Sequence, residues 1–368
     1  MRIQQLSRKL GLSARSIRFY EAKGLLPPAR RLENGYRVFG PEDEKRLKRI
    51  AALREIGLTL EEIGALPSAE GSAEAAEAIR KALERRRSEL FAQKNQLERD
   101  LETVGRMISR SESAAAPDAA SVEEDAWFAM AAELKRIREL HAGWTDVWDF
   151  NAQAARHDER VLGGASPAHP HYAQALEAVR ELIRPHQGES GLDIGTGTGN
   201  LAGLLIREGA VMSAAEQSSA MLEICRAKLP QLDARTGNFL YLPFNRGSFD
   251  FAVSSYAFHH LNDEQKPLAL REIRRVLKPG GRFCLADTMF ENAAHRERRI
   301  RELEQIERSS SRPGEPELSA GSEAGELLQI RNSYEAQLDE LLLLLDSEGW
   351  QTQCSHVSGR VYALLIST

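Results

Sequence analysis

The sequence predicts a multidomain protein in which a small helical module, a long helix and a larger α/β module follow one another. Three observations support this order. Residues 1 to 70 combine short helical patterns with a hairpin signal, residues 73 to 110 form an almost unbroken helical pattern, and the rest alternates buried strands with amphipathic helices. Such alternation is typical of an α/β fold with a largely parallel sheet.

Residues 6 to 20 predict two helices joined by a tight turn. Gly11 permits the turn, and Ser13 is a favourable N-cap for the second helix, which carries Arg15 and Arg18 outward. A helix-turn-helix with outward arginines is suited to binding DNA. We therefore expect the second helix to read DNA.

Residues 30 to 39 predict a β-hairpin, because Asn34 and Gly35 form the strongest short hairpin-turn signal. The hairpin would present Tyr36 and Arg37 as a wing beside the helix-turn-helix. Two more helices with clear N-terminal signals follow before residue 70.

The segment SARSIRFYEAKGLLPPARRLENGYRVF resembles the DNA-binding domain of the MerR family of transcription regulators. The resemblance implies a winged helix-turn-helix domain over residues 1–72 that binds double-stranded DNA. It maps five side chains to DNA-contacting positions: Arg15, Arg18, Tyr20, Tyr36 and Arg37. Arginine and tyrosine at such positions mainly contact phosphates, and the two helix arginines are the candidates for reading bases.

The charge distribution supports this assignment. Residues 1 to 70 hold 14 Lys and Arg against 9 Asp and Glu, whereas the remainder holds 35 against 45. A basic module is therefore attached to an acidic body, and a pI near 6.1 argues against nucleic-acid binding along the whole chain.

The helix predicted over residues 73–110 contains no proline and no glycine before Gly105. An isolated solvated helix is one interpretation, but apolar residues recur at heptad-like spacing, which predicts a coiled-coil seam. The seam positions are Leu83, Leu90, Leu97, Leu101, Val104 and Ile108. In the MerR family the corresponding helix pairs with its twin, so the resemblance implies a homodimer and a pseudo-palindromic operator.

Residues 111–125 have the composition of a linker, and the domain boundary is expected there. The α/β domain is expected over residues 126–368. Its first part, residues 127 to 160, reads as helical and carries Trp144, Trp148 and Phe150.

A glycine-rich turn between a buried strand and a helix is the most informative stretch of the α/β domain. Asp193 precedes Gly195, Gly197 and Gly199, which lets backbone N–H groups and the helix start approach a ligand. This D-x-G-x-G-x-G spacing differs from the G-x-G-x-x-G of dinucleotide sites, and an acid before the loop suits a cationic amino group better than a pyrophosphate. Glu216 ends the next strand, where an acid can accept ribose hydroxyls. The pattern therefore favours S-adenosylmethionine.

The loop, Glu216 and the stretches VSSYAFHHL and RRVLKPGGRF together resemble the class I S-adenosylmethionine-dependent methyltransferases. The resemblance implies a Rossmann-like domain with a mixed seven-stranded sheet, closed by an antiparallel strand pair, with an N-terminal segment over the cofactor pocket. The loop and Asp193 would contact the methionine part, Glu216 the ribose, and Asn238 with Phe239 the adenine, although many members carry Asp at the position of Asn238. The cofactor-binding candidates are Asp193, Gly195, Thr196, Gly197, Gly199, Glu216, Gln217, Asn238, Phe239 and Ser255.

His259 and His260 follow the fourth strand of the α/β pattern, at the sheet edge where ligands bind in such folds. Either imidazole could accept a proton from a methyl acceptor, and the alternative is that one only packs beneath the sheet rim. No metal is expected, because the three cysteines lie far apart and form no ligand spacing; the two that fall in predicted strands are expected in the core.

The first functional hypothesis is a MerR-like regulator whose C-terminal domain methylates a small molecule. The alternative is a non-catalytic sensor that uses the same domain only to bind an effector. Methylation of DNA or RNA is disfavoured, because the Asn-Pro-Pro-aromatic type of motif is missing after strand four. No signal peptide and no apolar run of membrane-spanning length is evident, so a cytoplasmic location is expected.

Overall fold

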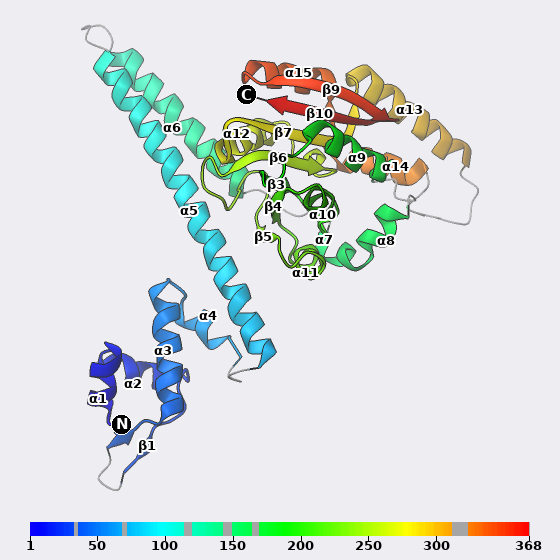
Figure 1. Cartoon of the computed structure of the whole chain (residues 1–368). Coiled ribbons are helices and arrows are strands. Elements are labelled where there is room, and N and C mark those ends of the chain that lie inside the picture. Colours follow the sequence, from blue (N-terminus) through cyan, green and yellow to red (C-terminus); the bar gives the residue numbers. More distant parts are fainter. Residues whose placement is uncertain are drawn as a thin grey trace. The chain divides into compact units, whose positions relative to one another are not determined.

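The computed structural model divides into two compact units, Met1–Leu90 and Phe91–Thr368. Figure 1 labels the helices and strands of both units, and helix α5 (Ala73–Ser113) contributes to each of them. The residues that the structure describes are 1–32, 36–67, 72–113, 120–142, 149–163, 169–310 and 323–367.

Unit 1 begins with the predicted helix-turn-helix. Gly11 adopts the left-handed conformation at the end of α1, and the Ser13 hydroxyl accepts the N–H of Ser16 at the start of α2, at 2.9 Å. Leu6 of α1 and Ile17 of α2 are fully buried in the same hydrophobic core. The elements are α1 (Ile3–Leu10), α2 (Ala14–Ala22), β1 (Arg30–Arg31), β2 (Arg37–Val38), α3 (Pro41–Glu55) and α4 (Leu60–Gly64).

The predicted hairpin and the two further helices are also present in unit 1. Strands β1 and β2 pair antiparallel, with Arg31 opposite Arg37. The Asn34–Gly35 turn of the prediction lies outside the described residues. The capping box predicted for the last of these helices is confirmed, since the Thr59 hydroxyl and the Glu62 carboxylate each accept the other's backbone N–H.

In unit 2 the second half of α5 packs antiparallel against α6 (Ala120–Ala142) (Figure 1). Arg138 of α6 donates to Asp100 of α5 at 2.8 Å. The second half of α5 also contacts the α/β domain, where Lys94 donates to the side chain of Asn245 at 2.8 Å, so it belongs to unit 2. The domain boundary at residues 111–125 stays a prediction.

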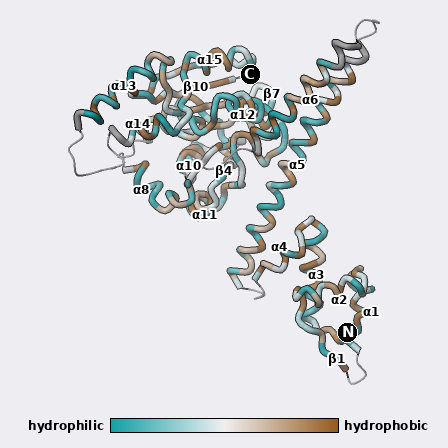
Figure 2. Tube along the Cα trace, turned by 180° about the vertical axis from the view of Figure 1, so that it is seen from behind, coloured by the Kyte–Doolittle hydropathy of each residue, from teal (hydrophilic) through white to brown (hydrophobic). Residues whose placement is uncertain are grey.

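The apolar seam predicted along α5 is exposed on the single chain. Figure 2 shows hydrophobic and hydrophilic residues alternating along this helix. The exposed fractions of the seam residues lie between 40% and 70%, for Leu83, Leu90, Leu97, Leu101, Val104 and Ile108. Arg87 and Lys94 interrupt the seam in its first half, and it becomes more apolar toward Ile108. An exposed apolar helix face is typical of a protein interaction surface, and the homodimer stays a prediction.

The α/β domain contains the predicted mixed sheet of seven strands. The first five strands are parallel, and β10 runs antiparallel to both of its neighbours, so the closing strand pair is confirmed. A further two-residue strand, β8 (Ala336–Gln337), pairs with the end of β7. The strand order is β5 (Asp233–Thr236), β4 (Val211–Glu216), β3 (Ser190–Ile194), β6 (Phe249–Ser255), β7 (Leu277–Phe290), β10 (Val361–Ser367) and β9 (Gln351–Ser358).

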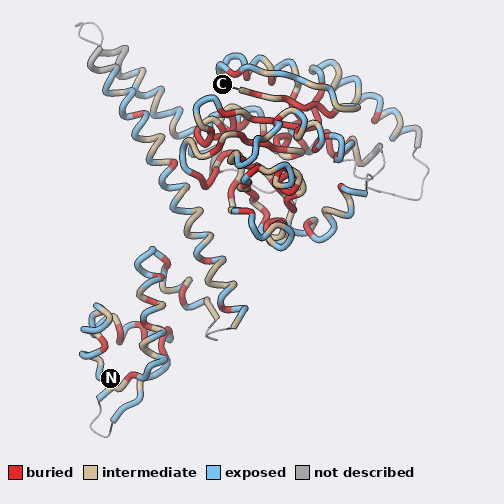
Figure 3. Tube along the Cα trace, viewed as in Figure 1, coloured by how far each residue is buried: buried red, intermediate tan, exposed pale blue. Residues whose placement is uncertain are grey.

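Two helical layers bury the faces of this sheet, and the strands β3, β6, β7 and β10 are buried along most of their length (Figure 3). One face packs against residues such as Val179 and Leu205, and the other against Ile273 and Leu345. The first layer consists of α9 (Tyr172–Ile183), α10 (Asn200–Arg207) and α11 (Ser219–Lys228), and the second of α12 (Gln265–Val276) and α15 (Leu338–Ser347).

Four short helical segments and one insertion surround the carboxyl edge of the sheet. The N-terminal cap comprises α7 (Phe150–Gln153), the turn η1 (Ala154–Arg156) and α8 (His157–Leu162). Trp144 and Trp148, which the sequence also assigned to this cap, lie outside the described residues. The turn η2 (Phe258–His260) follows β6, and the insertion of α13 (Ala293–Ser310) and α14 (Glu323–Asn332) follows β7.

Candidate functional site: a cavity at the carboxyl edge of the sheet

The three glycines of the loop all have left-handed backbone, with φ of 70°, 55° and 86° at Gly195, Gly197 and Gly199. A Cβ on Gly195 would lie 2.6 Å from the Cβ of Ala257, and one on Gly199 would lie 2.8 Å from Sγ of Cys225. Gly197 has more room, so its requirement for glycine comes from the backbone conformation. The loop therefore packs tightly on both sides and keeps its backbone bare toward the cavity.

Asp193 lies beneath this loop and does not line the cavity. Its Oδ2 accepts the hydroxyl of Thr196 at 2.6 Å and the N–H of Ala202 at 3.1 Å, so the carboxyl ties the loop to α10. Complete burial raises the pKa of Asp193 to about 7, the two hydrogen bonds oppose the increase, and the nearby charge of Glu216 adds to it. The structure thus places this residue as a support of the loop, whereas the sequence suggested contact with the methionine part.

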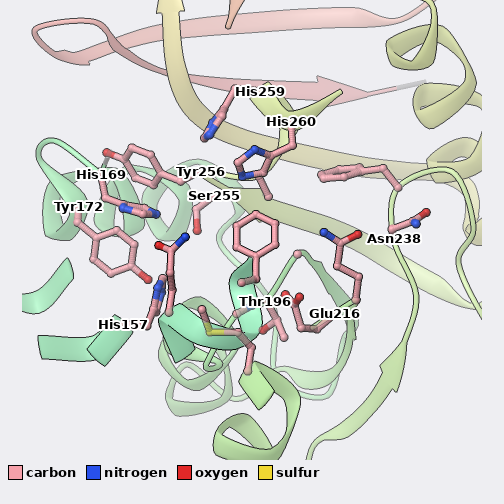
Figure 4. A pocket seen from close by; sticks show the side chains of 18 of the residues that line it. His157, His169, Tyr172, Thr196, Glu216, Asn238, Ser255, Tyr256, His259 and His260 are labelled. Carbon is pink, nitrogen blue, oxygen red and sulfur yellow. Dashed lines mark hydrogen bonds between the residues drawn. The ribbon is translucent and has the colours of Figure 1, made fainter. Parts of the chain in front are cut away.

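The cavity holds about 980 Å³ of empty space, part of it open to solvent, and Figure 4 shows many of its side chains. It brings together ten predicted site residues: Gly195, Thr196, Gly197, Glu216, Gln217, Asn238, Phe239, Ser255, His259 and His260. Gly199 lies behind the loop with Asp193. Sequence analysis missed a second group of lining residues: Gln153, His157, His169, Tyr172, Met221, Gly237, Ala257 and Gln329.

Glu216 and Asn238 lie at one end of the cavity (Figure 4). The Glu216 carboxylate accepts the N–H groups of Gly197 at 2.9 Å and Ser218 at 2.8 Å, which holds it at the end of β4. The amide oxygen of Asn238 accepts the N–H of Leu240 at 3.0 Å. Because each carboxylate oxygen has more than one lone pair, Glu216 can accept further hydrogen bonds from a ligand.

The opposite end is lined by imidazole and phenol groups from several segments (Figure 4). Burial lowers the pKa of His157, His169 and His260, and neighbouring charged groups add to the decrease for the latter two. Burial raises the pKa of Tyr172 to about 12. The hydroxyl of Tyr256, a residue with left-handed backbone, donates to the carbonyl of Pro170. Neutral side chains therefore form most of this end.

His259 differs from the other histidines because it is paired with a carboxylate. Its Nδ1 lies 2.7 Å from Oδ1 of Asp287, and its backbone N–H donates to Oδ2 of the same residue at 3.0 Å. Burial works against the charged imidazole, but the charge and hydrogen bond of Asp287, with a contribution from Glu335 that exceeds the opposing effect of Lys266, raise the pKa of His259. A carboxylate that orients an imidazole in this way is the arrangement of a general base.

The N-terminal cap is fastened beside the glycine-loop end of the cavity by two side chains. Oδ1 of Asn151 accepts the N–H of Ala220 and the hydroxyl of Ser218, at the start of α11. Asp158 accepts from Asn200 at 3.0 Å and from Lys228 at 2.8 Å. The cap therefore covers the cavity, whereas residues 127 to 142 of the segment that the sequence assigned to this role lie in α6, which packs against α5.

The residues predicted to bind DNA fall into two groups in unit 1. Arg15 and Arg18 are exposed on α2, and Tyr36 is 59% exposed beside the hairpin. Arg37 is half-buried and donates to Glu21 at 2.9 Å, which fastens the hairpin to α2. Tyr20 is buried in the core, so its ring supports the helix-turn-helix, and any contact of its hydroxyl with DNA stays a prediction.

Cysteine placement corrects one detail of the sequence analysis. Cys284 of β7 is buried as predicted, but Cys354 of β9 is exposed, because β9 is the edge strand, and Cys225 of α11 is the second buried cysteine. Within the described ranges no group of three His, Cys, Asp or Glu side chains could hold a metal ion. No described helix is long and apolar enough to cross a membrane.

Comparison with known proteins identifies both halves of the chain. An uncharacterized methyltransferase of Oceanobacillus iheyensis is 36% identical over 154 residues, covering 41% of this chain and 70% of that protein. One of Anoxybacillus flavithermus is 36% identical over 171 residues, 46% of this chain and 76% of that protein. A methyltransferase domain model matches residues 192–285. The chain belongs to the methyltransferase family, and the match of the MerR HTH regulatory protein model to residues 1–69 identifies its N-terminal part as a MerR helix-turn-helix domain.

Solved structures give a weaker similarity. A SAM-dependent methyltransferase of Thermotoga maritima, described as a possible histamine N-methyltransferase, is 22% identical, with a TM-score of 0.41 over 59% of this chain and 97% of that one. A similarity of this size says nothing about the substrate. The family models and the curated relatives therefore confirm the two resemblances and the fold class predicted from the sequence.

Proposed function

We propose that this chain is a DNA-binding regulator whose C-terminal domain binds S-adenosylmethionine and methylates a small molecule. The observation that carries the proposal is one cavity in which a bare glycine loop and Glu216 lie at one end and the His259–Asp287 pair lies at the other. A cofactor and a methyl acceptor can then meet between the two ends.

The residues at the first end fit S-adenosylmethionine. Gly195 and Gly197 leave room for the methionine part, and Glu216 offers carboxylate lone pairs to the ribose hydroxyls. The Asn238 side chain already accepts one backbone N–H through its oxygen, so its amide N–H groups are the better partners for a ring nitrogen of adenine. Phe239, which is almost completely buried, supplies an apolar wall for the base.

S-adenosylmethionine supplies an already activated methyl group, so the protein must mainly align the acceptor, exclude water and take up a proton. We assign the proton to Nε2 of His259, because Nδ1 is held by Asp287. The acceptor O–H, N–H or S–H would lose its proton to this nitrogen as the methyl group is transferred. His260 and Phe150, whose rings meet edge to face at 5.0 Å, would form a wall beside the acceptor.

The enclosure of the cavity favours a small acceptor over a macromolecule. The cap contributes Phe150, Gln153 and His157, and the insertion contributes Gln329 from another side. A nucleobase or a protein side chain would have to pass these elements. Because burial disfavours the charged form of most imidazoles at this end, a small and partly apolar molecule fits best.

DNA binding is assigned to unit 1. Arg15 and Arg18 are exposed on the second helix of the helix-turn-helix, where side chains can reach base edges or phosphates. The exposed apolar seam of α5 would join two copies of the chain, and a two-fold dimer would favour a pseudo-palindromic operator.

A sensor without turnover is the second candidate, and one observation favours it. The raised pKa of His259 favours the protonated imidazole, and a protonated imidazole cannot act as a base. The cofactor end does not depend on this residue. Under this alternative, S-adenosylmethionine would act as the effector of the regulator.

One experiment on the full chain separates the two. Labelled S-adenosylmethionine is incubated with a small-molecule extract, and DNA upstream of the reading frame is titrated in gel shifts with and without the cofactor. Labelled product supports the enzyme, whereas tight cofactor binding without product supports the sensor. The double variant Arg15→Ala/Arg18→Ala should lose at least about tenfold in DNA affinity, with Lys135→Ala on α6 as the matched control; unchanged affinity would contradict the DNA assignment.

A further inference from the structure

One loop of the α/β domain touches both the cavity and helix α5. The loop runs from Gly237 to Asn245, between β5 and β6. Its first residues, Gly237, Asn238 and Phe239, line the end of the cavity assigned to adenine. Its last residues lie against the part of α5 that belongs to the same unit.

A buried carboxylate forms the first link between this loop and α5. Oε1 of Glu272 accepts the N–H of Leu242 in the loop at 2.9 Å and the side-chain amide of Asn95 in α5 at 3.2 Å. Arg275 pairs with Glu272 and donates to the carbonyls of Leu242 and Phe244, at 3.0 and 2.9 Å. Each of these polar side chains is at most 9% exposed, so water competes little for their hydrogen bonds.

Cation–π contacts of Arg235 and a hydrogen bond of Lys94 form the second link. The Arg235 guanidinium lies 4.5 Å from the ring centroid of Phe244 in the loop and 5.9 Å from that of Phe91 in α5. Lys94 of α5 donates to the side chain of Asn245 at 2.8 Å. Phe91, Lys94 and Asn95 are spaced three and four residues apart, so all three side chains of α5 can contact the same part of the α/β domain.

The loop between these links and the cavity is internally fixed. Asn238 and Tyr241 exchange both backbone hydrogen bonds at 3.0 Å, and the Asn238 oxygen holds the N–H of Leu240. A Cβ on Gly237 would lie 2.6 Å from Cδ of Pro243, so the loop folds back closely on itself. If ligand binding moves Asn238, residues 241–245 should therefore move with it, because the contacts within the loop leave little room for independent movement.

We propose that this loop couples occupancy of the adenine end of the cavity to helix α5. The inference rests on the proposed binding of S-adenosylmethionine. Because α5 carries the exposed apolar seam and continues into the DNA-binding unit, its ordering bears on both dimerisation and DNA binding. Thermodynamic linkage makes the coupling reciprocal, so a change in α5 alters the affinity for the cofactor by the same factor.

Hydrogen exchange on the full chain tests the proposal, with S-adenosylmethionine and S-adenosylhomocysteine as the probes and calorimetry to measure their binding. Ligand should slow amide exchange in residues 238–242 and, at least about fivefold, in residues 91–104 of α5. In Asn95→Ala and in Arg235→Lys, the loop should still be protected, while slowing in α5 falls below about twofold. Gln93→Ala, an exposed substitution on α5, is the matched control and should behave as the wild type.

The outcomes distinguish this inference from the proposed function. Absence of ligand binding to the wild type would overturn both. Binding with protection of the loop but without any change in α5 would overturn the coupling alone. An unaltered α5 response in both variants would also overturn it, because the two links would then carry no signal. Thermal melting verifies the folding of each variant, and the conservative Arg235→Lys serves if Asn95→Ala does not fold.

Discussion

The two ends of the cavity are built in different ways. The cofactor end takes its shape from backbone: the glycine loop, the end of β4 and the start of the loop after β5. The histidine end is assembled from side chains that come from the cap, from η2 and from the insertion after β7. One end therefore follows from short continuous motifs, whereas the other depends on how distant segments pack.

The two ends of the cavity also differ in their electrostatics. Glu216 places a carboxylate at the cofactor end, where a cationic sulfonium ligand would be favoured. At the other end His157, His169 and His260 have lowered pKa values, and His259 alone among the described cavity histidines has a raised one. One end is therefore suited to binding the cofactor and the other to proton transfer. Substitutions at the first end should change the cofactor affinity, and substitutions at the second should change the rate of methyl transfer.

Loss of cofactor binding is the largest expected effect. In Gly197→Leu, the left-handed backbone costs about 1–2 kcal/mol for a residue with a Cβ, and the new side chain fills the ligand's space. We expect no measurable binding of S-adenosylmethionine by calorimetry. Gly280→Leu is the matched control, because Gly280 has φ of 74° with open space around it and lies outside the cavity lining. Retained binding in the cavity variant would show that the cofactor lies elsewhere.

At the histidine end, His259→Asn should lower kcat while leaving the cofactor affinity within about threefold. Loss of a general base typically lowers the rate by about 10²- to 10⁴-fold, and His259 does not belong to the cofactor end. Single-turnover methyl transfer and calorimetry measure the two effects separately. His186→Asn, an exposed histidine away from the cavity, is the control. An equal loss of affinity would mean that the two ends are not independent.

The same contrast explains what the sequence could predict. The helix-turn-helix and the glycine-rich strand-to-helix turn depend on local spacing and capping, and the structure and the family matches confirm them. His157, His169 and Gln329 belong to no motif, and only the fold brings them together. The placement of Asp193 beneath the loop depends on which face of β3 its side chain takes, and the spacing to the glycines does not determine that.

The pH dependence of the rate tests how Asp287 acts on His259. A base works in its neutral form, so activity should rise with pH through the raised pKa of His259, above 6.5. In Asp287→Asn the stabilising charge is lost while burial still opposes the imidazolium, so this limb should move to lower pH, and the plateau should fall about tenfold as the ring loses its orientation. If the rate of Asp287→Asn rose at the same pH as that of the wild type, the pairing with Asp287 would not be the cause of the raised pKa of His259.

The smallest effect on function is expected for Asp193→Asn, which keeps the shape of the loop support. Both hydrogen bonds to Asp193 enter the same oxygen, so an amide oxygen there can accept them, and the cofactor affinity should change less than about threefold. A much larger loss would instead support the direct contact with the methionine part that the sequence suggested.

Stability should respond more strongly than binding in this variant. Because the folded-state pKa of Asp193 is raised from 3.8 to about 7, its contribution to stability is fully present below pH 3.8 and is lost as the pH rises through about 7. Asparagine does not titrate, so the variant should gain stability relative to the wild type as the pH rises from 4 to 8, by up to roughly 4 kcal/mol. Urea unfolding at several pH values measures this difference. If the difference in unfolding free energy between the variant and the wild type stayed constant with pH, the pKa of Asp193 would not be raised. The charged carboxyl would then be reached by water, and the loop would be held more loosely than its hydrogen bonds indicate.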